Sequence, residues 1–451
     1  MRIFIIFLLF LLTSYNATAQ QFEVDTIQMN GSTDKLINFV ILGDGYTQNQ
    51  LNQFINDAHN ATNYLFNEKP FSHYHNYFNV FAIKVPSNVS GAANNPNNLI
   101  DNYFGSTFNY AGIERLLVST KTSNIVNVLA NNFPEYDQVI MIVNDTRYGG
   151  SGGRGWAATF STHDSSMEIF LHELAHSFAD LADEYWAGPQ YAAEKINMTQ
   201  NTNLTTLKWK NWHGDFNIGL YPYSESPTWY KPHPNCKMQY LGSNFCAVCS
   251  EGIIESIHSM TSPLYSYSPM SENITENDYP LSFNLYLIKP NPNTLRIKWI
   301  FNNSVINLNE EELILNETDL IEGNNTLIVS VEDTTNLLRI DNHNSIHLSV
   351  VNWEIQKIST SIKDVSFTST EMSINIYPNP FHDYLTIKFT QNLKENLKVE
   401  IIDIMGRIQT TQVFSPQEQY SLNLNNLHNG YYIMNLYLDN TLITSTKIIK
   451  E

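Results

Sequence analysis

Strand and helix patterns alternate along the first half of the chain, from about residue 24 to residue 260. A short apolar run, INFVILGD at residues 37–44, ends in Gly-Asp-Gly, which is typical of a strand buried on both faces. FNVFAIKV at 78–85 and DQVIMIVND at 137–145 have the same character. We therefore expect these segments to be strands of one buried sheet.

Helical patterns lie between these strands. After Thr47, a residue type that caps helices, apolar residues recur at the helical spacing: Leu51, Phe54, Ile55 and Ala58. Residues 111–132 predict a second helix before the last of the strands. The order β-α-β-α-β predicts an α/β layer with parallel strands.

After Pro269 the pattern becomes all-β. Residues 278–357 contain strand-like segments separated by Asn-rich turns, with no helical period, which predicts a small β-sandwich. The polar stretch at 358–372 is typical of a linker, and residues 373–451 repeat the all-β pattern. Two β modules are therefore expected to follow one α/β domain.

Composition and charge narrow the class of protein. A chain of 451 residues is too long for one core of ordinary size, so several domains are expected. With 42% hydrophobic and 12% aromatic residues it can bury substantial cores, so a disordered chain is not expected. The formal net charge of -19 argues against a nucleic-acid partner, because a phosphate backbone requires a basic face.

The N-terminal segment, MRIFIIFLLFLLTSYNATAQ, is typical of a secretory signal. Arg2 precedes an apolar run from Ile3 to Leu12, and a small-x-small triplet ends at Ala19. A membrane anchor would need about 20 apolar residues, and this run is shorter. We therefore expect a Sec-type signal peptide at residues 1–19, export from the cytoplasm, and no transmembrane segment after cleavage.

The chemistry is expected in FLHELAHSFADLADEYW at residues 170–186, which contains His-Glu-x-x-His. A helix is predicted to start just before it, at a Ser-Ser-Met-Glu capping box that ends at Glu168. His172 and His176 share a helix face and can hold one metal ion, while Glu173 lies beside them to activate bound water. Two unrelated histidines are the alternative. The helical position, the preceding strand and the downstream carboxylates favour a zinc site.

Two histidines leave the metal short of a ligand. If the helix continued, Asp183 would lie about 16 Å along the axis from His172, too far for a common ion. The chain must therefore turn after about Ala179. Asp183 is then the expected third ligand, and Glu184 is the alternative, either as a ligand or as a group that orients a histidine. Asp180 is expected to cap the helix or face solvent.

The three cysteines of the chain, Cys236, Cys246 and Cys249, lie close together in the sequence. In an oxidising compartment we expect one disulfide and one remaining thiol, and the sequence does not fix the pairing. The competing hypothesis is a structural zinc ion held by the three cysteines and His233, because C-x-x-C is a common half-site.

The sequence GSGGRG at 150–155 fits the dinucleotide-binding pattern G-x-G-x-x-G. A dinucleotide-binding loop must open a helix, whereas this segment leads into the strand-like run WAATFS. We expect the glycines to shape the rim of the cleft instead. WAATFS is then expected to be an edge strand that can pair with an extended peptide substrate.

A series of segments resembles the catalytic domain of the IgA-peptidase family of secreted bacterial zinc metallopeptidases, a metzincin-like group. In chain order they are VILGDGYT, FNVFAIKV, FGSTFNYAGIERLL, YDQVIMIVNDTRYGGSGG, HELAHSFADLADEY and CKMQYLGSNFCAVC. The resemblance covers about residues 24–260. It implies an α/β (α+β) zincin or metzincin-like catalytic domain, to which we assign residues 20–268, and a zinc endopeptidase activity.

The resemblance also implies roles for individual residues. The zinc ligands would be the two motif histidines and a downstream aspartate, which supports Asp183. Met238 in CKMQY matches the methionine turn under the metal. By spacing, Tyr240 matches a tyrosine that assists at the substrate oxyanion in some metzincins, and a packed aromatic is the alternative. The metzincin pattern usually has a glycine where Ala179 stands here.

The tail at residues 373–451 resembles the C-terminal sorting domain of type IX secretion, through IYPNPFHDYLTIKF, VEIIDIMGRI and LHNGYYIMNLYLDN. This implies inner-membrane export by the signal peptide, then outer-membrane passage by the type IX secretion machinery, after which such tails are commonly removed. Both β modules are expected to be immunoglobulin-like sandwiches, a class that does not fix the role of the middle one.

The prediction is a secreted or cell-surface enzyme with Zn2+ as its cofactor. It would hydrolyse peptide bonds of extracellular proteins, with immunoglobulins and other glycoproteins as candidate substrates. The alternative is a cell-surface binding protein with a vestigial zinc-peptidase domain. The intact His172, Glu173 and His176 favour the enzyme.

Overall fold

The computed structural model describes residues 21–275, 278–343, 347–357, 373–390, 393–403, 406–439 and 441–451. These residues form two compact units. The first extends to Ile355, apart from residues 275–277 and 321–324, and the second consists mainly of residues 356–451. The predicted signal peptide at 1–19 and the predicted linker at 358–372 lie outside the described residues.

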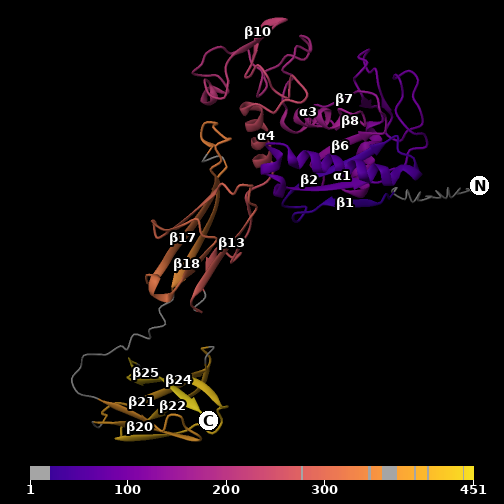
Figure 1. Ribbon diagram of the computed structural model, residues 1–451. Coiled ribbons are helices and arrows are strands. Elements are labelled where there is room, and N and C mark those ends of the chain that lie inside the picture. The colour runs from indigo at the N-terminus through magenta and orange to yellow at the C-terminus, as the bar shows by residue number, and fades with distance from the viewer. Residues whose placement is uncertain are drawn as a thin grey trace, which may run out of the picture. The chain divides into compact units, whose positions relative to one another are not determined.

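A six-stranded sheet forms the centre of the α/β part of the first unit (Figure 1). In spatial order its strands are β1 (Val24–Gln28), β3 (Phe78–Ile83), β2 (Ile37–Asp44), β6 (Gln138–Val143), β8 (Ala158–Ser161) and β7 (Gly150–Ser151). The four inner strands are parallel to one another, whereas β1 and β7 are antiparallel to their neighbours. The parallel α/β layer predicted from the apolar runs is confirmed.

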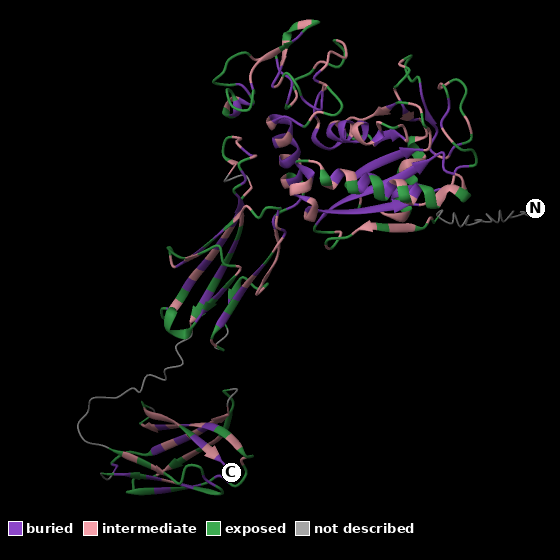
Figure 2. Cartoon of the chain, in the orientation of Figure 1, coloured by how far each residue is buried: buried purple, intermediate pink, exposed green. Residues whose placement is uncertain are grey.

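Both faces of this sheet are covered, which explains why its central strands are apolar at almost every position. Phe39 and Ile41 of β2 belong to the core on one face, and Val40 and Leu42 belong to the core on the other. The central strands β2, β3 and β6 are buried along their whole length (Figure 2). Parallel strands covered on two sides have no face that meets water, so they need no alternation of polar residues.

The described residues form four α-helices: α1 (Leu51–Asn67), α2 (Thr122–Asn132), α3 (Ser166–Ala179) and α4 (Ala247–Met260). Helix α1 buries Phe54, Ala58 and Leu65, which follow the predicted helical spacing. None of the described helices is both long and apolar enough to cross a membrane.

The predicted helix at residues 111–132 is wrong in its first half. Helix α2 begins only at Thr122. Ala111 and Gly112 have φ angles of 54° and 78°, in the left-handed region that a right-handed helix excludes. The apolar spacing that predicted a helix therefore extends into a loop before Thr122, whose backbone conformation is not helical.

Short elements complete this part of the chain. The short strands are β4 (Ser106–Thr107), β5 (Val118–Ser119), β9 (Tyr221–Tyr223) and β10 (Ser226–Lys231). The 3-10 helices are η1 (Gln48–Gln50), η2 (Phe71–His73), η3 (His75–Tyr77) and η4 (Lys210–Trp212).

Two further sheets of the first unit enclose one apolar core. One contains β11 (Leu264–Ser268), β13 (Leu281–Leu287) and β16 (Glu312–Leu315) in that order. The other contains, in spatial order, β12 (Asn273–Ile274), β18 (Ser349–Lys357), β17 (Gly323–Asp333), β14 (Leu295–Phe301) and β15 (Ser304–Leu308). A 3-10 helix, η5 (Glu317–Asp319), follows β16 in the chain. Trp299 and Trp353 stack in the shared core with ring centroids 6.0 Å apart. Alternate residues of β18 point into this core, as the predicted sandwich requires.

Asp333, at the end of β17, connects this core to the α/β part. Its carboxylate accepts hydrogen bonds from Tyr74 at 2.7 Å and Thr294 at 2.6 Å, and His258 of α4 lies 3.2 Å away. Burial disfavours the charged carboxylate, but the hydrogen bonds from His258, Thr294 and Tyr74 outweigh it and lower the pKa of Asp333 from 3.8 to about 2. The charged form of Asp333 is therefore stabilised by folding.

Replacement of Asp333 by asparagine is expected to destabilise the first unit by about 2 kcal/mol at pH 7, the free energy that corresponds to this pKa change. Because the folded pKa is below the unfolded one, this stability is present above about pH 4 and is lost as the pH falls toward 2. Urea unfolding of the parent and of Asp333→Asn, at pH 7 and again as the pH is lowered toward 2, measures the difference in their free energies of unfolding. Asp278→Asn, an exposed position, is the control. A difference that stays constant with pH would contradict the assignment.

The second unit consists of two sheets around its own core. One contains β19 (Ile374–Tyr377), β20 (Tyr384–Phe389) and β23 (Gln419–Asn423). The other contains β22 (Ile408–Phe414), β21 (Leu397–Asp403), β24 (Gly430–Leu438) and β25 (Thr441–Lys450). Leu385 and Ile387 of the first sheet and Ile401 and Met434 of the second belong to one buried cluster. The all-β character predicted for the tail is confirmed.

Candidate metal centre

Helix α3 carries both histidines of the His-Glu-x-x-His motif on one face. The rings of His172 and His176 are perpendicular, with centroids 4.8 Å apart, and their Nε2 atoms are 3.1 Å apart. Ile169, Phe170 and Leu174 of the same helix are buried in the core, which fixes the rotation of the helix about its axis. The two imidazoles are therefore held together at the surface of a packed helix.

The chain turns immediately after α3. Asp180 has φ 53° and ψ 31°, a left-handed conformation that ends the helix at Ala179, so the predicted turn is confirmed. Ala179 is still helical and the left-handed residue is Asp180, so no glycine is needed at 179. Aspartate tolerates the left-handed conformation better than most residues. The Asp180 carboxylate forms an ion pair with Lys195 and lies 3.9 Å from Arg154. Asp180 therefore caps the end of α3, one of its two expected roles, and its carboxylate pairs with basic side chains.

The turn brings Asp183 back to the histidines. Its Oδ1 atom lies 3.0 Å from His172 Nε2 and 3.3 Å from His176 Nε2. One ligand atom from each of the three residues lies within 4.8 Å of the others. The neighbouring Glu184, the alternative ligand from the sequence, faces a different cluster, where its Oε1 lies 3.2 Å from the sulfur of Cys249.

The orientation of the two rings fits a zinc ion. His172 Nδ1 lies 3.1 Å from the carbonyl oxygen of Lys237, and His176 Nδ1 lies 2.6 Å from that of Leu181. A carbonyl oxygen only accepts, so each Nδ1 carries a proton and donates it, and each ring in its neutral form presents an Nε2 lone pair. These lone pairs and Asp183 Oδ1 would repel one another without a cation among them. A tetrahedral zinc site separates such ligand atoms by roughly 3.3 Å, given zinc-to-ligand distances of about 2.0–2.2 Å.

Electrostatics also favour a positive charge at this point. Burial disfavours protonated His176, but the adjacent Asp183 carboxylate outweighs burial and raises the pKa of His176 from 6.5 to about 9. The same contact lowers the pKa of Asp183 well below its usual range, against the effect of burial. The His176–Asp183 pair thus stabilises a cation, whether a proton or a metal ion.

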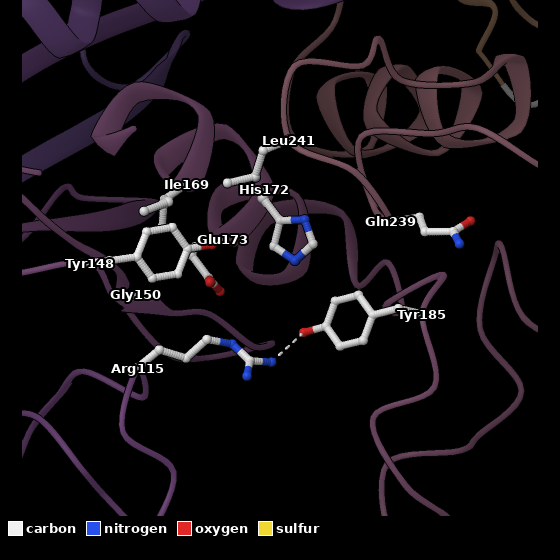
Figure 3. Close-up of a pocket in the computed structure, with 9 residues that line it drawn as sticks. All are labelled: Arg115, Tyr148, Gly150, Ile169, His172, Glu173, Tyr185, Gln239 and Leu241. Atoms are coloured by element: carbon white, nitrogen blue, oxygen red, sulfur yellow. Dashed lines mark hydrogen bonds between the residues drawn. The ribbon is translucent and has the colours of Figure 1, made fainter. Parts of the chain in front are cut away.

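Glu173 lies in a pocket beside His172 (Figure 3). Burial raises the pKa of its carboxyl group, and the nearby histidines partly offset that effect. In Figure 3 the Glu173 carboxylate and the His172 ring face the same space as the Tyr185 hydroxyl. A carboxylate with a raised pKa that shares this space with His172 has the properties of a general base.

The glycine-rich segment forms one wall of this pocket. Gly150 lines it, and a Cβ atom on Gly152 would lie 2.2 Å from the backbone oxygen of Glu173. Only glycine allows the backbone to pass this close to α3. The segment forms β7 and a loop and is followed by strand β8, as expected for a rim and not for a dinucleotide site. The prediction that WAATFS is the edge strand is wrong, because β7 pairs with β8 at Gly150 and Ser151 and forms the edge.

Tyr185 and Arg115 line the pocket but were not identified as site residues from the sequence. Tyr185 lies parallel to His172, with ring centroids 6.4 Å apart and 14° between the planes. Its hydroxyl oxygen lies 3.4 Å from a guanidinium nitrogen of Arg115, which comes from a loop before α2. Burial and the nearby Asp183 carboxylate raise the pKa of Tyr185, so its hydroxyl stays protonated. The proximity of Tyr185 to the Asp183 ligand was the available signal in the sequence.

The segment around Met238 contacts His172, because the carbonyl oxygen of Lys237 lies 3.1 Å from His172 Nδ1. Met238 is fully buried, and its carbonyl oxygen accepts a hydrogen bond from the amide of Glu184 at 2.8 Å. Glu168 forms an ion pair with Lys237 and accepts a hydrogen bond from the amide of Gly242 at 2.9 Å. The capping box predicted at the start of α3 is wrong, because Ser165 makes no side-chain cap and Glu168 holds this segment instead.

Tyr240 differs from the expected arrangement. Its side chain is 51% exposed, and its hydroxyl accepts a hydrogen bond from the side-chain Nε2 of Gln239 at 2.8 Å. The residues that line the pocket include Gln239 and Leu241 but not Tyr240. A role for Tyr240 in catalysis stays a prediction.

All three cysteines are free, and they surround Glu184 in a second cluster. His233, the fourth ligand in the zinc hypothesis, is not in this cluster, and its Nδ1 accepts a hydrogen bond from the amide of Asn235 at 3.0 Å. The expected disulfide is absent in this structure.

Comparisons with known proteins give two family matches. Residues 26–225 match the family described as IgA Peptidase M64, and residues 375–451 match the secretion system C-terminal sorting domain. The curated proteins compared with the chain include no match.

The solved structures show only distant similarity. Dimeric latent PorU from Porphyromonas gingivalis is 14% identical to this chain over the matched region, with a TM-score of 0.15. The match covers 42% of this chain and 20% of the PorU chain. Fibronectin(III)-like modules of CbhA from Clostridium thermocellum are 11% identical, cover 41% of this chain and 90% of their own, and also score 0.15. The chain spans about a fifth of the PorU chain. Scores of this size support no conclusion about fold or function.

Proposed function

We propose that the protein is a secreted zinc-dependent endopeptidase, because residues 26–225 match the family described as IgA Peptidase M64 and residues 375–451 match the secretion system C-terminal sorting domain. His172, His176 and Asp183 are the proposed zinc ligands, and Glu173 is the proposed catalytic residue. A metzincin-like catalytic fold and immunoglobulin-like β modules belong to the same proposal. The observation that carries it is the convergence of two Nε2 lone pairs and a carboxylate beside Glu173.

The protein residues have separate tasks in this mechanism. A zinc ion at His172, His176 and Asp183 supplies a Lewis acid that lowers the pKa of water toward about 7 and polarises the scissile carbonyl. Glu173 accepts the proton of the attacking water and donates it to the leaving amine. Its raised pKa suits both steps, because a group that must accept and release a proton works best near the operating pH.

Tyr185 and Arg115 are proposed to stabilise the oxyanion of the tetrahedral intermediate. The neutral Tyr185 hydroxyl donates a hydrogen bond, and the guanidinium of Arg115 adds positive charge. Both groups face the pocket that contains the Glu173 carboxylate (Figure 3). Tyr240, the residue expected from the metzincin spacing, is the alternative hydroxyl.

Tyr185→Phe is expected to lower kcat for peptide hydrolysis by about 10²-fold, the usual cost of one lost oxyanion donor, with zinc content unchanged. Tyr240→Phe is the matched control, because it removes the same hydroxyl from an exposed side chain. Steady-state kinetics on one fluorogenic peptide separates the two. If only Tyr240→Phe lowers kcat, the hydroxyl comes from Tyr240 and the assignment of Tyr185 is wrong.

The C-terminal unit is proposed to direct the protein through the type IX secretion machinery. The sorting-domain match supports secretion or a cell-surface location, and a peptidase there would meet extracellular proteins as substrates. Export by a Sec-type signal at residues 1–19 and removal of the tail after secretion are parts of the same proposal.

Casein hydrolysis by the purified protein, beside a Glu173→Gln variant and with zinc measured on both, tests this function. Cleavage by the parent alone would support it. The alternative, a binding protein with a vestigial site, predicts no cleavage by either and no zinc at the two histidines. The family match and the complete donor set favour the enzyme.

A further inference from the structure

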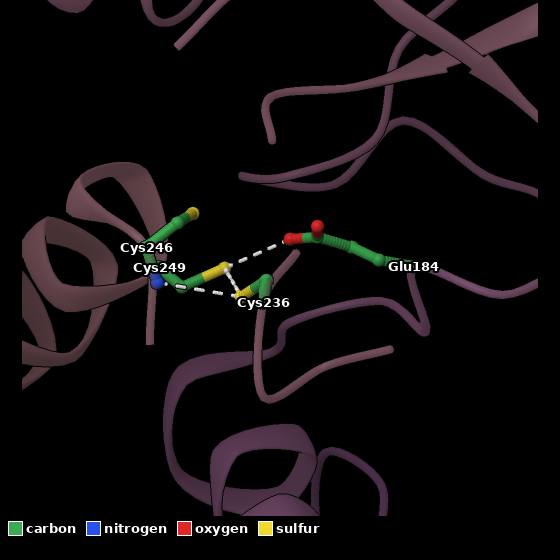
Figure 4. A group of neighbouring side chains, drawn as sticks. All are labelled: Glu184, Cys236, Cys246 and Cys249. Carbon is green, nitrogen blue, oxygen red and sulfur yellow. Dashed lines mark hydrogen bonds between the residues drawn. The ribbon is translucent and has the colours of Figure 1, made fainter. Parts of the chain in front are cut away.

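Three segments that are distant in the sequence bring four further side chains together. Glu184 follows the turn after α3, Cys236 precedes Met238, and Cys246 and Cys249 lie at the start of α4. Their ligand atoms all lie within 4.8 Å of one another, and all four residues are buried (Figure 4). The cluster is distinct from the group formed by the two histidines and Asp183.

The distances in this cluster match a tetrahedral metal site. The sulfurs of Cys236 and Cys249 are 3.7 Å apart, and the Cys249 sulfur lies 3.2 Å from Glu184 Oε1. With a zinc-to-sulfur distance of about 2.3 Å, a tetrahedron separates two sulfurs by roughly 3.8 Å. A disulfide requires about 2.05 Å between its sulfurs. The geometry is therefore that of two ligands of one ion.

The carboxylate of Glu184 needs a cation in this environment. Glu184 is 0% exposed, and its Oε2 atom has no hydrogen-bond partner among the described residues. Its Oε1 atom accepts a hydrogen bond from Asn197 at 3.1 Å. The nearby Lys231 donates to the backbone oxygen of Glu184 and to Gln239, so it does not neutralise the carboxylate directly. A buried carboxylate beside three thiols is costly unless a positive charge compensates it.

The start of α4 is suited to hold thiolates. Cys246 is the residue before the helix, and Cys249 lies in its first turn, where the peptide dipoles favour negative charge. The amide of Cys246 also donates a hydrogen bond to the sulfur of Cys236 at 3.4 Å. Backbone donors of this kind stabilise sulfur as an anionic ligand.

We propose that Cys236, Cys246, Cys249 and Glu184 form a second, structural zinc site. Thiolate ligands select soft divalent ions such as zinc, and four protein ligands leave no open position for a substrate. Binding of one Zn2+ releases the three thiol protons. Glu184 thus replaces His233 as the fourth ligand of the site suggested by the C-x-x-C spacing.

This second ion would hold the catalytic residues in place, a consequence that rests on the proposed function. Glu184 is adjacent to Asp183, and the amide of Glu184 donates to the carbonyl of Met238. Cys236 is adjacent to Lys237, whose carbonyl accepts the Nδ1 proton of His172. One ion therefore ties the segment that carries the third ligand to the segment that orients a histidine.

A disulfide between Cys236 and Cys249 is the competing arrangement. It would leave Cys246 as a buried thiol and the Glu184 carboxylate without a cation. Alkylation of the unfolded full-length protein in the presence of a chelator distinguishes the two by mass. The zinc site predicts that all three cysteines are alkylated, whereas modification of one cysteine alone would overturn it.

Metal content and cobalt spectra give the direct test. The full-length protein is expected to contain about two zinc ions per chain and, after exchange with Co2+, to show an intense sulfur-to-cobalt charge-transfer band. Cys246→Ser and Glu184→Gln are each expected to lose one ion, together with the charge-transfer band, because the ion they lose is the one that the sulfurs hold. Replacing both His343 and His347, which lie near Glu255 in another cluster, should change neither. A parent protein without the band would overturn the proposal.

The same spectra separate this inference from the proposed function. Asp183→Ala is expected to lose one ion but to keep the charge-transfer band, because its ligand atom is not sulfur. If the band is present in a protein that cleaves no substrate, the structural site stands and the peptidase assignment falls. If the protein cleaves substrate but lacks the band, the peptidase assignment stands and the structural zinc site falls.

Discussion

Replacing Glu173 with glutamine is expected to lower kcat for casein or peptide hydrolysis by about 10³-fold and to leave the zinc content of the protein unchanged. Glutamine has nearly the same shape as glutamate but cannot accept a proton at neutral pH. Glu173 faces the pocket without belonging to the group formed by His172, His176 and Asp183, so the metal ligands stay in place. Initial rates and metal analysis on the same preparation provide both quantities.

Glu114→Gln is the matched control for this variant. It removes an equal charge from an exposed residue next to Arg115 that does not line the pocket. We expect the control to keep nearly full activity. Full activity in Glu173→Gln would contradict the role of Glu173 as general base, and loss of zinc would show that it acts through the metal site instead.

Replacing Asp183 with alanine is expected to remove the catalytic zinc ion and to lower kcat/KM by about 10³-fold or more. A Lewis acid contributes several kcal/mol to this reaction, and each 1.36 kcal/mol corresponds to about tenfold in rate. Asp183 also supplies the negative charge that lies against both Nε2 atoms. Without it, two neutral imidazoles remain, and zinc is expected to dissociate in dilute buffer.

Glu184→Gln is the informative comparison for Asp183→Ala. The two residues are adjacent, but their side chains face different clusters. Glu184→Gln is therefore expected to keep the zinc ion at the histidines, which cobalt spectra can identify by the absence of sulfur ligands. If Asp183→Ala kept its zinc and its activity, the ligand assignment would be wrong.

The sequence predicted the sheet well because its strands are buried on both faces. The predicted bounds of 37–44 are those of β2, and the other two runs include β3 and β6. A continuous apolar run leaves few alternatives for such a strand. The start of α2 was less predictable, because apolar spacing does not report the left-handed backbone at Ala111.

The His-Glu-x-x-His motif and the approximate end of α3 were also predictable from local spacing. The choice between Asp183 and Glu184 was not, because it depends on the rotation of the chain after Asp180. The same limit explains Glu168, which binds Lys237 far along the chain instead of capping its own helix. The partners of these side chains are set by contacts between distant segments of the chain, and short-range sequence patterns carry no information about such contacts.

The cysteine cluster gives a similar lesson. The spacing of Cys236, Cys246 and Cys249 suggested a zinc half-site, but the fourth group comes from Glu184, far upstream in the sequence. Tyr185 was overlooked for a related reason. A tyrosine after a buried glutamate resembles a packed aromatic, and only the fold places its hydroxyl beside Arg115.

Zinc-dependent peptide hydrolysis is the central claim, and metal removal tests it most directly. Casein cleavage by the purified protein would be measured with ortho-phenanthroline and with its meta isomer, which cannot chelate. The proposal predicts that only the ortho isomer abolishes cleavage and that added Zn2+ restores it. Cleavage at the parent rate by protein shown to be free of metal would contradict the claim.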